Sequence, residues 1–102
     1  MTVVEKTAGG GHAEGQSTRV SAHAAHAEGT DGVASGHSAH VEGTGSVASG
    51  QSSHAEGEGT AASGLDSHAE GKTTQSIGKY SHSEGEGTVA QGDWSHAEGR
   101  NT

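Results

Sequence analysis

The sequence predicts an all-β repeat protein, a β-solenoid with coils of fourteen residues. Three observations predict this fold. A His-x-Glu-Gly block recurs every fourteen residues, a glycine recurs about every seven, and the positions between them alternate between small and variable side chains. A fixed period of this kind indicates a stack of similar units, each packed only on its neighbours.

The fourteen-residue period holds along almost the whole chain without an insertion. In each copy Glu follows His by two residues and Gly follows it by three. The seven histidines of the block are His12, His26, His40, His54, His68, His82 and His96. An insertion would shift side chains off their columns, which explains why the period is constant.

Composition taken alone is typical of a disordered chain. Only nine of the 102 residues are Val, Leu, Ile or Phe, nineteen are Gly, and the net charge is −8. The repeat argues against disorder.

Because there is no cysteine, disulfides and thiolate metal sites are excluded. The opening MTVVEKTAGGG has no apolar run, so we expect neither a signal peptide nor a membrane span, and an acidic chain with five Lys and Arg does not suit a nucleic-acid backbone.

Each coil divides into two half-repeats of the form small-x-Ala-x-Gly. Ser95–Gly99 is one kind and Thr88–Gly92 is the other, and the two kinds alternate. A helix is excluded because each glycine in its interior would cost about 1 kcal/mol. Alternation fits short strands instead, so that two strands and two turns form one coil, and each strand pairs with its equivalent about 4.8 Å away.

Small residues fill both columns that alternation places inside the coil. Nothing larger than Val occurs in either, which predicts a very flat lumen. The columns are Ser53, Thr60, Ser67, Thr74, Ser81, Thr88 and Ser95, and residues 55, 62, 69, 76, 83, 90 and 97. The recurring glycine is expected either to adopt a positive φ or to lie too close to other backbone for a β-carbon.

Outward positions differ between the two strands of a coil. One strand carries the constant His and Glu, whereas the other varies, with Val33, Val47 and Val89 in its most apolar column. A lumen of Ala, Ser and Thr buries little apolar surface, so we expect an obligate oligomer in which neighbouring chains cover one outer face. The uniform His–Glu face is the preferred interface, and the Val column is the alternative.

Ser46–Gly50 followed by Ser53–Gly57 resembles the head repeats of trimeric autotransporter adhesins, the YadA-like heads, and the resemblance covers about Gly11–Thr102. It implies a left-handed parallel β-roll, three chains side by side in a homotrimer, and attachment at the bacterial outer surface. One departure is that the bulky aliphatic residue before the family's strand glycine is Ser in four coils and Ile only at Ile77. Similar repeats also resemble segments of phage tail fibres, so a structural or receptor-binding segment of a virion fibre is the alternative function.

Domain organisation follows from the extent of the repeat. Residues 1–10 are expected to form an N-terminal tail, and residues 11–102 a single β-roll of about six and a half coils. We expect no enzymatic activity, because neighbouring Ser and His on a strand point to opposite faces and form no nucleophile–base pair. No cofactor and no membrane insertion by this segment are expected.

The His and Glu columns are the candidate trimer interface. Stacked imidazoles about 4.8 Å apart are near enough to share a zinc ion, yet a ladder of structural hydrogen bonds is favoured over metal binding or proton sensing, because metal sites seldom repeat seven times. His23 and His37 fall in a turn and are expected to be solvated. The interface candidates are His26, Glu28, His40, Glu42, His54, Glu56, His68, Glu70, His82, Glu84, His96 and Glu98.

Three consecutive turns carry unusual residues and are the candidate ligand contacts. They hold the only aromatic side chains of the chain, and exposed aromatic residues on loops are common in binding surfaces. These residues are Leu65, Asp66, Lys79, Tyr80, Asp93 and Trp94. The partner expected for an adhesin head is a host matrix protein or a glycan, whereas a structural spacer would have no ligand.

Overall fold

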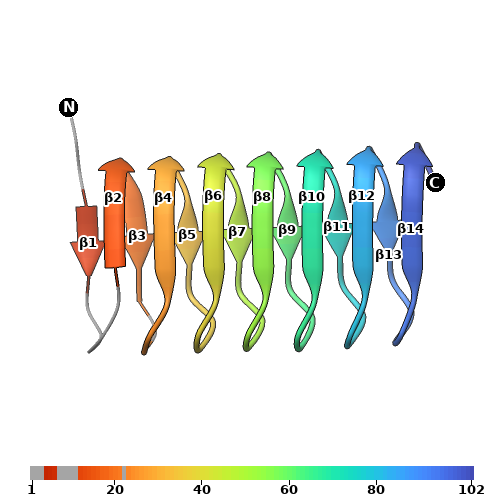
Figure 1. Cartoon of the computed structure of the whole chain (residues 1–102), viewed down its shortest axis with the longest axis horizontal. Coiled ribbons are helices and arrows are strands. Elements are labelled where there is room, and N and C mark those ends of the chain that lie inside the picture. Colours follow the sequence, from red (N-terminus) through yellow and green to blue (C-terminus); the bar gives the residue numbers. More distant parts are fainter. Residues whose placement is uncertain (1–3, 7–11, 22) are drawn as a thin grey trace.

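The structure, a computed structural model, describes residues 4–6, 12–21 and 23–102. These residues form strands joined by short turns, and no helix among them is long and apolar enough to cross a membrane. The predicted all-β class is confirmed. The chain forms a parallel β-solenoid of about six coils, each built from two strands and two turns (Figure 1).

Two parallel sheets form the walls of the solenoid. Sheet A contains β1 (Val4–Lys6), β3 (Thr18–Val20), β5 (Val33–Ala34), β7 (Val47–Ala48), β9 (Ala61–Ala62), β11 (Gln75–Ser76) and β13 (Val89–Ala90). Sheet B contains β2 (His12–Gln16), β4 (His26–Thr30), β6 (His40–Thr44), β8 (His54–Glu58), β10 (His68–Lys72), β12 (His82–Glu86) and β14 (His96–Arg100).

Pairing within both sheets keeps every residue beside the residue fourteen positions away. In sheet B, His54 pairs with His68 and Glu56 with Glu70, and in sheet A, Ala48 pairs with Ala62. In Figure 1 the chain runs up each strand of sheet B in front and down each strand of sheet A behind while it advances from β1 to β14. This winding is left-handed, opposite to the hand of ordinary crossover connections and in line with the family resemblance.

The lumen between the sheets is as flat as the sequence predicts. Its largest fully buried side chains are Val20 and Val41, and the Cα trace measures only 10 Å along its shortest axis. Most inward hydroxyls are hydrogen-bonded: Ser53 Oγ donates to the Gly50 carbonyl at 2.7 Å, and Thr60 Oγ1 donates to Ser46 Oγ at 2.9 Å. Among the described residues, Thr18 Oγ1 and Ser95 Oγ near the two ends are the buried hydroxyls without a partner. Small polar residues are therefore tolerated inside because the backbone lies within their reach.

The recurring glycines are required for close approach between coils. A β-carbon on Gly57 would overlap the carbonyl oxygen of Gly71, and one on Gly64 would overlap that of Gly78. Gly57 also has φ of +111°, a conformation that L-residues rarely adopt, whereas Gly64 does not have a positive φ. Close packing is thus the reason common to both half-repeats, and the positive φ applies only in sheet B.

Left-handed turn residues occur two positions after each of these glycines, and also at Ala24, where the glycine series has Ala22 in the sequence. The sequence interpretation missed this feature. Among the described residues all of them have φ between 53° and 65°. They are Ser17, Ala24, Asp31, Ser38, Gly45, Ser52, Gly59, Asp66, Thr73, Tyr80, Gly87, Trp94 and Asn101. The Gly, Asn and Asp at six of these positions are the available sequence signal, because these residue types tolerate the left-handed region best.

Strand β1 lies within the segment assigned from the sequence to an N-terminal tail. Its three residues pair in parallel with β3, Val4 beside Thr18 and Lys6 beside Val20, at the spacing of fourteen seen elsewhere. The backbone ladder of sheet A therefore continues into residues 4–6.

Candidate functional site

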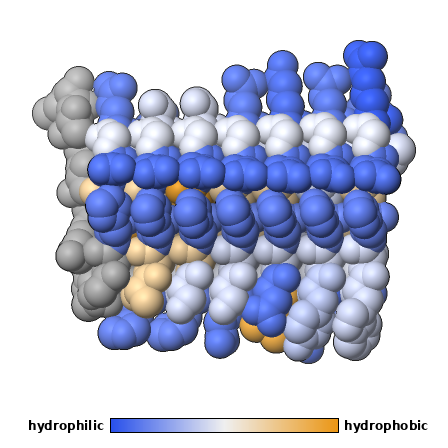
Figure 2. Space-filling model, viewed as in Figure 1, coloured by the Kyte–Doolittle hydropathy of each residue, from blue (hydrophilic) through white to orange (hydrophobic). Residues whose placement is uncertain are grey.

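The outer face of sheet B carries two parallel columns of polar side chains. They are the histidines from His12 to His96 and the glutamates from Glu14 to Glu98, which together we call the His–Glu ladder. Alternation along each strand places them outward while Ser53 and Ala55 point into the lumen, as predicted. Figure 2 shows two hydrophilic bands running side by side across this face from one end of the solenoid to the other.

The imidazole rings of the ladder are stacked. Centroids of neighbouring rings lie 4.6 to 4.8 Å apart, from His12 on His26 to His82 on His96. Parallel pairing of like over like sets this spacing, since each strand repeats its neighbour. The rings remain half-buried: in the centre of the ladder the side chains of His54 and Glu56 are 35% and 32% exposed.

Each histidine contacts the glutamate of its own strand. The separation of His Nε2 and Glu Oε2 is 3.3 Å for His54 and Glu56, and across the seven pairs it ranges from 3.3 to 3.8 Å. Toward the C-terminal end, His82 Nε2 also lies 3.8 Å from Oε1 of Glu70 on the preceding coil. The ladder is therefore a two-dimensional network of close acid and base groups.

Within the single chain these contacts do not form regular hydrogen bonds. Five imidazole Nε2 atoms are buried and have no hydrogen-bond partner within the described residues: His26, His40, His54, His68 and His82. Unpartnered buried polar atoms are rare in native proteins and need an explanation. Within a single chain, the hydrogen-bonding capacity of the His–Glu ladder is therefore not satisfied.

Carboxylates of the ladder share protons along their column. Hydrogen bonds with Glu70 and Glu42, assisted by burial and by the like charge of these neighbours, raise the pKa of Glu56 to about 7. The pKa of Glu84 is raised in the same way, chiefly by its hydrogen bonds with Glu70 and Glu98. The pKa values of Glu42 and Glu70 are lowered, because each accepts a hydrogen bond from Glu56. Like charges stacked in register thus favour alternate protonation.

Two histidines of the ladder, His54 and His82, favour the neutral form. Burial, followed by the like charge of stacked neighbours, lowers the pKa of His54 and of His82. At pH 7 these imidazoles therefore contribute little positive charge to the face.

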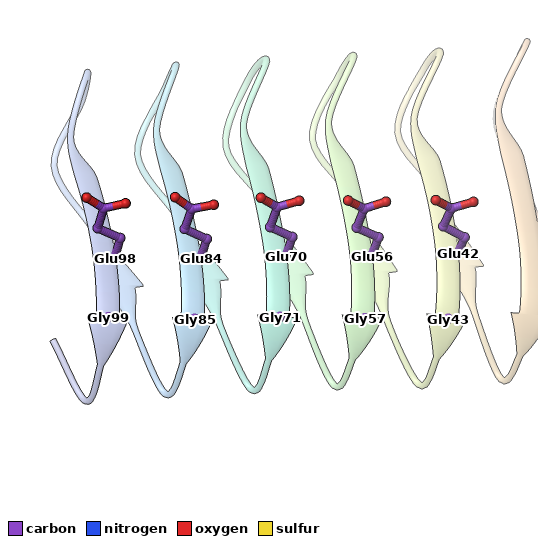
Figure 3. A pocket seen from close by; sticks show the side chains of 10 residues that line it. All are labelled: Glu42, Gly43, Glu56, Gly57, Glu70, Gly71, Glu84, Gly85, Glu98 and Gly99. Carbon is purple, nitrogen blue, oxygen red and sulfur yellow. The ribbon is translucent and has the colours of Figure 1, made fainter.

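A shallow groove runs beside the glutamate column. It has a volume of about 950 Å³ and is lined by the glutamates from Glu42 to Glu98 and by the glycine that follows each of them (Figure 3). A second stretch of about 530 Å³ continues it from Glu42 to Glu14. Because glycine has no side chain, the carboxylates stand clear of the backbone and are accessible from solvent along the groove.

The candidate ligand-contact turns form a second column, at one end of the flat coils. The Tyr80 and Trp94 rings stack with centroids 5.6 Å apart, and the side chains are 46% and 75% exposed. The backbone N–H of Tyr80 donates to the Leu65 carbonyl, and that of Lys79 donates to Asp93 Oδ1 at 3.0 Å. The structure therefore brings the three turns together on consecutive coils, with Asp66 exposed at the first of them. His23 and His37, in the same column of turns, are exposed and stack at 5.4 Å.

Two stretches of the chain, residues 27–53 and 83–102, match the family model of the YadA head domain repeat. These two stretches are YadA head repeats. This confirms the resemblance to the heads of trimeric autotransporter adhesins. YadA head repeats form a structural adhesin family, and their surface-exposed location in adhesins suggests the cell surface. No curated protein matches the chain.

The raised pKa of Glu56 predicts a pH-dependent gain in stability when its carboxylate is removed. The pKa of Glu56 is about 7 in the folded chain and 4.5 ordinarily, so between pH 4.5 and pH 7 the folded chain keeps a proton that the unfolded chain loses. The free energy of unfolding therefore falls as the pH rises through this range. Glu56→Gln should therefore raise the melting temperature at pH 8 by about 4–8 °C, equivalent to about 1 kcal/mol after discounting for solvent screening, and leave it unchanged at pH 4.

Glu58→Gln is the matched control, because it removes the same charge two residues along the same strand, from a side chain that is exposed and pairs with Lys72 at 3.8 Å. Thermal melts followed by circular dichroism at both pH values measure the difference. Equal shifts in the two variants would show that the shared-proton account of the glutamate column is wrong.

Proposed function

We propose that the chain is an adhesin head, a module that assembles as a homotrimer at the bacterial outer surface and contacts a host matrix protein or glycan through its turns. Family membership of the repeats supports the adhesin class. The observation that carries the binding role is the exposed Tyr80–Trp94 stack, which lies at a turn position occupied by Ser in two other coils, at Ser38 and Ser52.

The two aromatic residues are unfavourable choices for folding at this position. Tyr80 has φ of +59° and Trp94 of +58°, and a left-handed conformation costs an ordinary L-residue about 1–2 kcal/mol. Neither ring is buried in the lumen, so packing does not compensate for this cost. Strained, exposed aromatic side chains are typical of binding surfaces, which favours a ligand contact here.

Homotrimer assembly is supported by the unsatisfied face of the single chain. The lumen is filled by residues no larger than Val, and five buried imidazole Nε2 atoms have no hydrogen-bond partner in the part of the chain that the structure describes. A neighbouring chain with the same repeat presents the same groups at the same spacing, so one favourable contact would be repeated on every coil. The proposed interface is accordingly the His–Glu ladder, from His26 and Glu28 to His96 and Glu98.

Replacing the turn aromatics tests the binding role. Tyr80→Ser together with Trp94→Ser installs the residue that the same turn position holds elsewhere, so the backbone is retained. If the wild-type chain binds a surface among immobilised collagen, fibronectin, laminin and a glycan array, the variant should bind that surface at least tenfold more weakly, because a hot-spot residue contributes about 2 kcal/mol or more.

The paired control is Ser38→Ala with Ser52→Ala, at the same position in two other coils, which should leave binding unchanged. A wild-type chain that binds none of these surfaces, or an aromatic variant that binds as the wild type does, would favour the structural spacer of a fibre.

Replacing three central histidines of the His–Glu ladder tests the proposed interface. Light scattering of the wild-type chain in EDTA should give the mass of three chains, and His54→Ala, His68→Ala and His82→Ala together should lower the melting temperature at pH 7 by several degrees. The comparison is Val33→Ser, Val47→Ser and Val89→Ser in the outward column of sheet A. If the valine variant dissociates and the histidine variant melts like the parent, the interface lies on sheet A.

A further inference from the structure

The His–Glu ladder has a second property, which a single chain already provides. Its imidazole nitrogens and carboxylate oxygens gather in five groups, in each of which one ligand atom per residue lies within 4.8 Å of the others. Four groups contain two histidines and the glutamate between them, as in His54, Glu56 and His68, and the fifth contains Glu84, His96 and Glu98. We propose that the ladder binds divalent transition-metal ions, with zinc as the representative ion.

The spacing of each His–Glu pair suits a chelate. His54 Nε2 and Glu56 Oε2 are 3.3 Å apart, as are the corresponding atoms of His26 and Glu28. Two ligands held about 2.0–2.2 Å from a tetrahedral zinc ion lie about 3.3–3.6 Å from each other, so the pair needs little rearrangement.

The orientation of the imidazoles agrees with this spacing. In spite of the short distance, Nε2 of His54 has no hydrogen-bond partner among the described residues, so the N–H direction is not aligned with the carboxylate oxygen. In a chelate, both donor atoms point toward a third position and not toward each other. An unaligned pair at chelate distance therefore favours a shared cation over a hydrogen bond.

A third ligand comes from the next coil. The ring of His68 is stacked on that of His54 with centroids 4.6 Å apart, and two zinc–nitrogen bonds span about 4.2 Å at most, so one ring must swing inward. Both rings are half-exposed and have the freedom to do so. Water can occupy the remaining position.

Charge on the face favours a dication. Glutamates stacked in register repel one another along the column. Lys72 and Arg100 lie on the same face but pair with Glu58 and Glu86, outside the ladder. A divalent ion held by Nε2 neutralises two carboxylates at once.

The donor set selects the kind of metal. Imidazole with carboxylate suits zinc, copper and nickel, whereas calcium and magnesium take six or more oxygen ligands. Neighbours among the first four groups share a histidine, as His40 is common to the first and second, so these four cannot all be filled together. The largest sets without a shared residue have three groups, for example the first, the third and the last, which gives three ions per chain.

Equilibrium dialysis against zinc chloride in chelator-treated buffer at pH 7.5, followed by elemental analysis, measures this capacity. The wild-type chain should bind about three zinc ions with saturation and no calcium in a parallel dialysis. His40→Ala with His68→Ala removes a ligand from each of the first four groups and leaves only Glu84, His96 and Glu98, so the capacity should fall to about one third.

His23→Ala with His37→Ala is the matched control, since it removes two stacked histidines that have no glutamate of the ladder beside them, and it should retain three ions. Circular dichroism of each variant establishes that it is folded. Zinc lost equally from both variants, no saturable zinc in the folded wild-type chain, or calcium bound in preference to zinc would overturn the proposal. Light scattering on the same samples reports the oligomeric state separately, because each site is built within one chain.

Discussion

Parallel stacking at a spacing of fourteen residues is the constraint on which the rest of the structure depends. Every strand pairs with the strand fourteen residues away, so each side chain lies beside the same position of the next coil, and each property of one coil becomes a column along the whole molecule. Small side chains form the lumen, imidazoles form a stack and carboxylates form a row. A residue type that stabilises one coil is thus repeated in every coil, and so is a residue type that destabilises it.

The glutamate column shows the unfavourable side of this repetition. A single exposed glutamate would be unremarkable, but seven in register repel one another, and hydrogen bonds with neighbouring carboxyl groups raise the pKa of Glu56 and of Glu84. The histidines beside them are too buried and too close to one another to supply full compensation. A face with this imbalance is suited to an external partner, whether a second chain or a cation.

Much of the fold follows from the sequence because the period and the alternation act on the backbone directly. The two sheets, the inward Ser, Thr and Ala columns and the flat lumen were all predictable, since a slip of one residue would exchange inside for outside. The place of Tyr80 and Trp94 on adjacent coils was predictable from the same spacing. Handedness was not, because nothing in the spacing distinguishes the two hands and only the family resemblance indicates the left-handed one.

Features that depend on atomic geometry were not predictable. The left-handed turn residues are Ser, Thr, Ala, Tyr and Trp at seven of thirteen described positions, residue types that carry little signal for a positive φ. Spacing alone places His54 near Glu56, but it does not reveal that Nε2 lacks a hydrogen bond, since this depends on the ring orientation that stacking imposes. The site is therefore visible in the sequence as a pattern, and its unsatisfied chemistry only in the structure.

The claim that like must stack on like at fourteen residues is tested most directly by two deletions that begin at the same place. Removing residues 55–68 joins His54 to Ala69 and takes out one whole coil, whereas removing residues 55–61 joins His54 to Ala62 and takes out half a coil. Thermal melts followed by circular dichroism should show that the first deletion remains a cooperative β-protein, shorter by about 4.8 Å, while the second, which places His and Glu over the outward residues of sheet A, melts far lower or fails to fold. Equal stability of the two proteins would show that a period of seven suffices and would contradict the account.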